Sequence, residues 1–286
     1  MKTFRQIGMM LFAVLVSVNL TSCNSDDEND SVGEDSQTEK PVREKKLVRV
    51  VSYDVEDSRE KLDDILEFIY DTKGNVVEIL EKYDDGDSYS CKYVWDSNKS
   101  ITCTWDDEYV KYSLHNGKIS NVEECFYSWH TGQPKLDEDF YRLTYDKDGN
   151  LMEYWAKYNE EDEYELEERL TWDNGRLSFY EDYNSLITLR YSDKTCKGFF
   201  PLLYEYVNCD DYLFMAQPEL VGIKMSYLPS KIIDGNCTIS FECELDTEGY
   251  VGSCAVNKYY SYDHDYNGDG RDDYNSYDYL YEFVWE

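Results

Sequence analysis

The sequence has 286 residues, of which 61 are acidic and 28 are basic, so its formal net charge at pH 7 is −33. Nonspecific binding to nucleic acid depends on Lys and Arg side chains against phosphate, and so strong an acidic excess excludes this class. The same charge disfavours docking on anionic lipid headgroups. Aromatic residues make up 16% of the chain and Pro occurs only 5 times. This composition favours strands over helices.

The N-terminal segment, residues 1–22, has the features of a bacterial signal peptide. Lys2 and Arg5 give it a positive start, and the apolar run at 8–20 is too short for a typical membrane span. The run ends in Leu-Thr-Ser-Cys, which resembles the bacterial lipobox, where the Cys is lipidated and becomes the new N-terminus. We therefore predict a lipoprotein signal peptide and a lipidated Cys23. The alternative is an ordinary secretory signal that ends near a Cys.

Residues 23–45 are predicted to form an acidic flexible tether. Almost no apolar side chain is present there, so the segment cannot bury enough surface to offset the entropy lost on ordering. Its acidic run at 26–30 resembles the surface-export signal of Bacteroidetes lipoproteins, and a plain solvated linker is the alternative. The expected location is the outer membrane, lipid-anchored and facing the cell exterior.

From residue 46 onward the sequence alternates between apolar and polar side chains. In the clearest segment Tyr164, Leu166, Leu170 and Trp172 are predicted to share one face, with charged residues on the other. Such alternation is typical of an antiparallel sheet that has one apolar and one solvated face.

A short unit, Tyr-Asp-x-x-Gly-Asn, occurs at 70–75 and at 145–150 and is typical of a hairpin, because Gly and Asn tolerate a positive φ. Further reversal signals recur about every 10–15 residues. We therefore predict an all-β fold, a long antiparallel up-and-down meander. A one-faced sheet of this length must curl into a barrel-like or half-barrel form to bury its apolar side.

The alternation is lost over residues 194–230. This apolar segment is predicted to contain a short helix near Asp211–Leu220. We interpret it as a partly helical insertion that covers the apolar face of the sheet, since such a face would be unstable in water. Residues 46–286 are thus expected to form a single β-meander domain.

A late block, 220–232, contains Leu228-Pro229-Ser230-Lys231-Ile232. Together with the lipobox and the hairpin units, this block resembles a family of Bacteroidetes lipoproteins that share a domain of unknown function with a porin-like fold. The resemblance implies a curled, many-stranded antiparallel sheet and carries over no catalytic residues. Alternation also marks membrane barrels. The predicted anchor, the tether and the charged terminal Glu286 favour a domain held beside a membrane over a pore.

The loop at 265–273 has the spacing of a calcium loop, with oxygen side chains at alternate positions and Gly270 at the sharp turn. The twelfth position is Ser276 instead of an acid, and Asp278 is a possible substitute. A polar hairpin loop is the alternative reading. The predicted ligands are Asp265, Asn267, Asp269, Asp273 and the backbone carbonyl of Arg271, and the expected role of calcium is structural.

The chain has 9 Cys residues, and eight remain besides Cys23, an even number in an oxidising compartment. Cys91 and Cys103 lie symmetrically about Ser97, so we expect them to face each other across one hairpin as a possible disulfide. Cys243 and Cys254 flank another turn and are expected to lie diagonally. The alternative is that these residues are buried thiols that act as small hydrophobes.

No catalytic motif is recognisable, so an enzyme is not the favoured reading and no catalytic residue is assigned. The favoured function is a surface-anchored lipoprotein with a binding or accessory role at the cell envelope, with a glycan or a lipid or other apolar molecule as ligand. One alternative is a carboxylate-based glycan-active enzyme, which would need an acidic cleft with a raised carboxylate pKa. The other is a purely structural envelope protein, which would have a filled interior.

Overall fold

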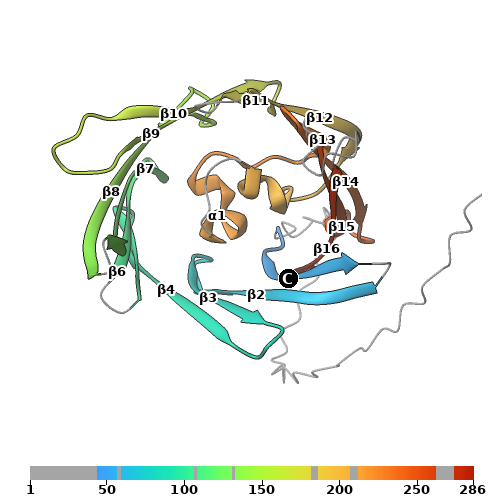
Figure 1. The fold of residues 1–286 in the computed structure, drawn as a ribbon, viewed down its shortest axis with the longest axis horizontal. Coiled ribbons are helices and arrows are strands. Elements are labelled where there is room, and N and C mark those ends of the chain that lie inside the picture. The colour runs from blue at the N-terminus through green and yellow to red at the C-terminus, as the bar shows by residue number, and fades with distance from the viewer. Residues whose placement is uncertain are drawn as a thin grey trace, which may run out of the picture. The chain divides into compact units, whose positions relative to one another are not determined.

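The computed structural model describes residues 44–56, 59–105, 108–130, 133–181, 186–206, 212–261 and 274–286. Its strands are β1 (Leu47–Glu56), β2 (Arg59–Tyr70), β3 (Val76–Tyr83), β4 (Ser88–Asp96), β5 (Ser100–Trp105), β6 (Glu108–His115), β7 (Lys118–His130), β8 (Gln133–Tyr145), β9 (Leu151–Lys157), β10 (Glu165–Asp173), β11 (Arg176–Glu181), β12 (Leu186–Thr195), β13 (Tyr227–Asp234), β14 (Cys237–Leu245), β15 (Val251–Ser261) and β16 (Tyr274–Trp285). Each strand pairs antiparallel with its neighbours in sequence, and β16 pairs with β1 to close a barrel. The predicted all-β meander is confirmed, and it closes fully (Figure 1).

The repeated Tyr-Asp-x-x-Gly-Asn unit forms the turns at one end of the barrel. In the first copy the carboxylate of Asp71 accepts hydrogen bonds from the backbone N–H groups of Lys73 and Asn75, at 2.8 and 2.9 Å. Gly74 supplies the positive φ of 91° that the reversal requires. The bond from the Asn75 backbone is the main reason that the pKa of Asp71 is lowered. The copy at Asp146 makes the same contacts.

An aromatic side chain at the end of a strand ties neighbouring hairpins together at this end of the barrel. Tyr70 Oη donates a hydrogen bond to the carbonyl of Leu47 at 2.6 Å, and Trp95 Nε1 donates to the carbonyl of Val76 at 2.8 Å. In each case the acceptor is the carbonyl of the first or second residue of the preceding strand. The same contact recurs as Tyr145 to Ile119, Trp172 to Leu151, Tyr191 to Leu177 and Trp285 to Val251.

The insertion between β12 and β13 lies inside the ring of strands (Figure 1). It contains two short 3-10 helices, η1 (Pro201–Tyr206) and η2 (Pro218–Leu220), and the α-helix α1 (Tyr212–Ala216). The predicted short helix is confirmed by α1 and η2. The expected limits, 194–230, were too wide because β12 extends to Thr195 and β13 begins at Tyr227. We call the described residues of this insertion, 196–206 and 212–226, the plug.

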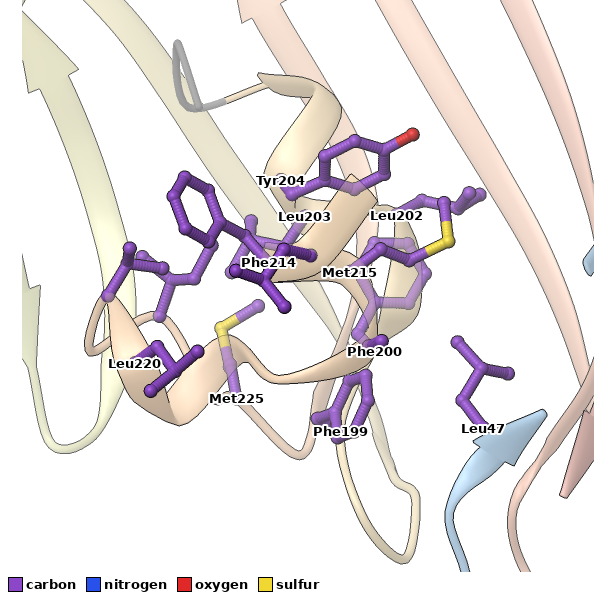
Figure 2. Packing of buried hydrophobic residues seen from close by; sticks show 14 of the residues in the cluster. Leu47, Phe199, Phe200, Leu202, Leu203, Tyr204, Phe214, Met215, Leu220 and Met225 are labelled. Carbon is purple, nitrogen blue, oxygen red and sulfur yellow. The ribbon is translucent and has the colours of Figure 1, made fainter. Parts of the chain in front are cut away.

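The plug fills much of the lumen with apolar side chains (Figure 2). Phe200 packs edge-on against Phe241 of β14, with ring centroids 5.5 Å apart, and Phe214 packs against Tyr112 of β6 at 5.9 Å. Fully buried plug residues include Leu202, Leu203, Leu213, Met215, Val221 and Ile223. The hydrophobic core of this barrel therefore lies within it, between the plug and the inward faces of the strands.

Polar contacts also hold the plug against the turns. The side-chain oxygen of the buried Gln217 accepts a hydrogen bond from the backbone N–H of Val76 at 2.9 Å. The backbone N–H of Leu151 donates to the carbonyl of Gly222 at 3.3 Å. A Cβ at Gly222 would overlap the carbonyl oxygen of Gly149, so only glycine allows the plug to approach this hairpin so closely.

The outward face of the barrel carries paired charges. Because Tyr112 points inward to the plug, its neighbour Lys111 points outward. The Nζ atom of Lys111 lies 4.0 Å from Oε2 of Glu123 on β7. By the same alternation the outward side chains of β2 to β4 include Lys82, 2.6 Å from Glu67. Such surface pairs contribute little stability, but they are typical of a face that contacts water.

The predicted face of residues 164–172 was wrong in its first half. A β-bulge in β10 sets Leu166 opposite Trp155 and Glu168 opposite Tyr154, so one extra residue shifts the alternation. Leu166 therefore points outward, whereas Leu170 is fully buried inside. Sequence alternation alone does not show where a bulge falls.

Candidate functional site

A cavity of about 480 Å³ remains in the lumen beside the plug. The plug bounds it with Tyr212 and Phe214 of α1, and the inward faces of β4 to β10 form its opposite wall. Its volume is within the range of small-molecule sites. The cavity is thus the candidate functional site.

Aromatic rings dominate the cavity wall. Tyr141 of β8 and Tyr154 of β9 stack with their centroids 5.3 Å apart, and Tyr112 meets Phe214 edge-on. These tyrosines point inward because each alternates with an outward polar residue on its strand. A wall of rings of this kind can stack on a flat or apolar ligand.

Carboxylates accompany the rings. Glu124 of β7 and Glu167 of β10 line the cavity. Asp139 lies directly opposite Glu124 on the neighbouring strand, and like charges in this arrangement repel each other. Burial raises the pKa of Asp139, Asp137 raises it further, and a hydrogen bond from Tyr141 opposes the increase.

Tyrosine hydroxyls of the lining donate to Glu167 and to a further acid, Glu81 of β3. Tyr158 Oη lies 3.0 Å from Glu167 Oε1, and Tyr212 Oη lies 2.9 Å from Glu81 Oε1. Burial, followed by these acidic partners, raises the pKa of both tyrosines. Their hydroxyls therefore remain protonated donors at neutral pH.

Cys91 and Cys103, the predicted pair, both line the cavity. The expectation that they face each other was wrong, because Cys103 pairs with Tyr93 and the turn is centred on Asn98. Cys91 therefore lies diagonally across from Cys103, a separation that exceeds the usual reach of a disulfide unless the strands shift. The disulfide between them stays a prediction.

A disulfide joins Cys243 and Cys254. The expected diagonal arrangement of this pair was wrong, since the two residues lie directly opposite each other on β14 and β15. A register shift between Glu244 and Leu245 adds the residue that brings them into line.

Two further predictions lie outside the described residues. They are the lipidated Cys23, with residues 23–43 of the predicted tether, and the calcium loop at 265–273. The last two residues of the predicted tether, Glu44 and Lys45, are described and form ion pairs with Lys224 and Glu248. Asp278, the possible substitute ligand, lies within β16 and accepts a hydrogen bond from Asn257. Within the described ranges, no three His, Cys, Asp or Glu side chains gather closely enough to hold a metal ion, and no helix is long and apolar enough to cross a membrane.

Sequence reasoning did not identify the cavity. Its wall comes from seven strands and the plug, and only the register shows which inward tyrosines meet around Phe214. The sequence signal was only the general abundance of tyrosine, which does not locate the cavity.

The fold is similar to solved porin-like proteins. A crystal structure from Bacteroides uniformis matches with a TM-score of 0.58 and 12% identity, covering 84% of this chain and 98% of that one. One from Bacteroides vulgatus matches with a TM-score of 0.48 and 13% identity, covering 84% and 98%. No protein-family model and no curated protein matches the sequence. At such low identity the likeness shows the porin-like fold alone.

Proposed function

We propose that this protein is a surface-anchored lipoprotein that binds a small ligand in the cavity inside its barrel. The observation that carries the proposal is the cavity itself, about 480 Å³ in volume, with Tyr and Phe rings on both the plug and the strands. A purely structural barrel has no need of such a space, and tight packing would fill it. The volume suits a compact molecule or the end of a longer one.

The barrel is proposed to stand in water beside the membrane. Two features support this: the plug occupies much of the lumen, and paired charges such as Lys82 and Glu67 lie on the outward face. A membrane barrel would instead turn an apolar band outward and keep a polar lumen. The attachment is then the lipid on Cys23, with residues 23–45 as the tether.

The anchor predicts a clear change on substitution. The Cys23→Ser variant has no thiol to lipidate, so it should move from the membrane fraction to the soluble fraction of the cells. A Cys91→Ser variant, which keeps the lipobox, should stay with the membrane. Retention of Cys23→Ser in the membrane fraction would contradict lipid anchoring at this residue.

Ligand binding is tested by filling the cavity. Ala156 of β9 is buried and lines the cavity, so Ala156→Trp should occupy it, whereas Ala255→Trp on the outward face of β15 should not. The full chain would be heated with glycans, fatty acids and small aromatic compounds, because a ligand of the native state raises the unfolding temperature.

Repeating the scan with calcium or a chelator tests the loop at 265–273.

The expected result is a ligand that stabilises the natural protein and Ala255→Trp but not Ala156→Trp. Leu143→Phe, a smaller block in the same wall, covers the case in which Ala156→Trp does not fold. A shift that persists in both blocked variants would remove the cavity as the site. If no ligand has an effect, the structural alternative is favoured.

The glycan-active enzyme is retained as a second candidate for one reason, which is that Glu124 and Glu167 line the same cavity. Two carboxylates that flank a sugar are the usual catalytic pair of glycosidases. If the protein releases reducing ends from a glycan of the panel and Glu124→Gln does not, the enzyme is the correct function.

A further inference from the structure

The electrostatic character of the cavity is set by ring faces and carboxylates. The faces of aromatic rings carry partial negative charge. Glu124 and Glu167 add full negative charge to the same wall, and Asp139 stands directly opposite Glu124. The described lining residues include no Lys, Arg or His.

Elsewhere in the chain, aromatic rings have a basic side chain of the protein over them. Lys46 lies 4.5 Å from the ring centre of Tyr70, and Arg176 lies 4.1 Å from that of Tyr227. On the outward face of β8 to β10, Arg142 and Lys157 cover an aromatic cluster in the same way. The cavity wall combines aromatic rings with carboxylates.

Tyrosine hydroxyls donate hydrogen bonds to two acids of this part of the barrel. The hydroxyl of Tyr158 donates to Glu167, and that of Tyr141 donates to Asp139 at 3.4 Å. A donated hydrogen bond stabilises the ionised carboxylate and leaves its other lone pairs available. The tyrosine hydroxyls are thereby directed at the acids.

We propose that the ligand of this cavity is an organic cation, an ammonium group on a compact apolar or aromatic body. This inference rests on the proposed function and specifies the charge of its ligand. The ammonium group lies between the carboxylates of Glu124 and Glu167, and its positive charge is attracted to both. The apolar body contacts the rings of Tyr154 and Phe214, which also attract the cation.

The charge of the whole protein acts in the same direction. A net charge of −33 attracts cations to the barrel and repels anions. A fatty acid would have to place its carboxylate among these acids, so this ligand class is disfavoured. Neutral glycans would stack on the rings but gain nothing from the charge.

Three probes with the same phenylpropyl body test the proposal by isothermal titration of the full chain: 3-phenylpropylamine, 3-phenylpropanol and 3-phenylpropionate. At pH 7 they carry a positive charge, no charge and a negative charge. The amine should bind at least about 10-fold more tightly than the alcohol, because a desolvated cation gains from both rings and carboxylates. The carboxylate should bind more weakly than the alcohol.

Substitutions assign the effect to the cavity. Glu124→Gln and Glu167→Gln keep the shape of the side chain and remove its charge, and each should weaken the amine about 10-fold while leaving the alcohol unchanged. The matched control is Glu242→Gln, on the outward face of β14 next to the inward Phe241. It should alter none of the three affinities.

Equal affinities for the three probes, or a preference for the carboxylate, would overturn the proposal. It is also overturned if the amine binds as well to Glu124→Gln and Glu167→Gln as to the natural protein. If none of the probes binds while another ligand gives a shift that Ala156→Trp removes, the cation inference fails and the proposed function stands. If no ligand shift depends on the cavity, both fail.

Discussion

Replacing Phe200 with Ala is expected to lower the free energy of unfolding by about 3–5 kcal/mol. Phe200 is 2% exposed and packs edge-on against Phe241, so its loss leaves a cavity between the plug and β14. Urea unfolding, followed by circular dichroism, measures the change. The midpoint should fall without a change in slope, since the surface exposed on unfolding stays the same.

Phe179→Ala is the matched control for this variant. Phe179 is 37% exposed and lies on the outward face of β11, where it pairs with Thr171. Its removal deletes the same atoms but opens no internal cavity, so the loss should stay below about 1 kcal/mol. If the two variants lost equal stability, the plug would not be the hydrophobic core that the structure describes.

Reduction of the disulfide between Cys243 and Cys254 should lower the stability by about 3 kcal/mol, on the loop-entropy account for so short a loop. The two residues are separated by 11 positions. For a domain of this size that loss corresponds to a fall of about 6–12 °C in the unfolding temperature. A thermal scan with and without dithiothreitol measures it.

The double variant Cys243→Ser, Cys254→Ser should not respond to dithiothreitol, whereas Cys237→Ser should respond like the natural protein. A natural protein that is insensitive to reduction would contradict the bond. A double variant that remains sensitive would show a second disulfide, for which Cys91 and Cys103 are the predicted partners.

The sequence predicted the architecture because its hairpin turns are local. Asp71, Gly74 and Asn75 specify a reversal by their own hydrogen bonds and φ preference, and the long run of alternating strands then leaves few solutions. The loss of alternation over residues 194–230 is also a local signal, and it indicated the plug. Closure of the barrel could not be predicted, since it depends on the pairing of β1 with β16 across the whole domain.

The sequence did not allow the register between neighbouring strands to be predicted. A bulge moves Leu166 to the outward face, and another brings Cys243 opposite Cys254. Each adds one residue to one strand, which reverses every later side chain without a sequence signal that alternation can detect. The cavity escaped prediction in the same way, because it exists only where particular inward tyrosines meet Phe214.

The competing functions now differ in what they require of the lumen. A carrier of long lipids would need a large open apolar interior, and the plug occupies much of that space. A structural barrel would need none, and a cavity remains. Binding of a compact molecule agrees with both observations.

The most direct test of this account is a crystal structure of the protein with the ligand that gives the largest shift in unfolding temperature. The account predicts ligand density in the lumen, between Phe214 of the plug and Tyr154 of β9, with polar ligand atoms next to Glu124. Density confined to the outward face of the barrel, with the lumen unchanged, would contradict it.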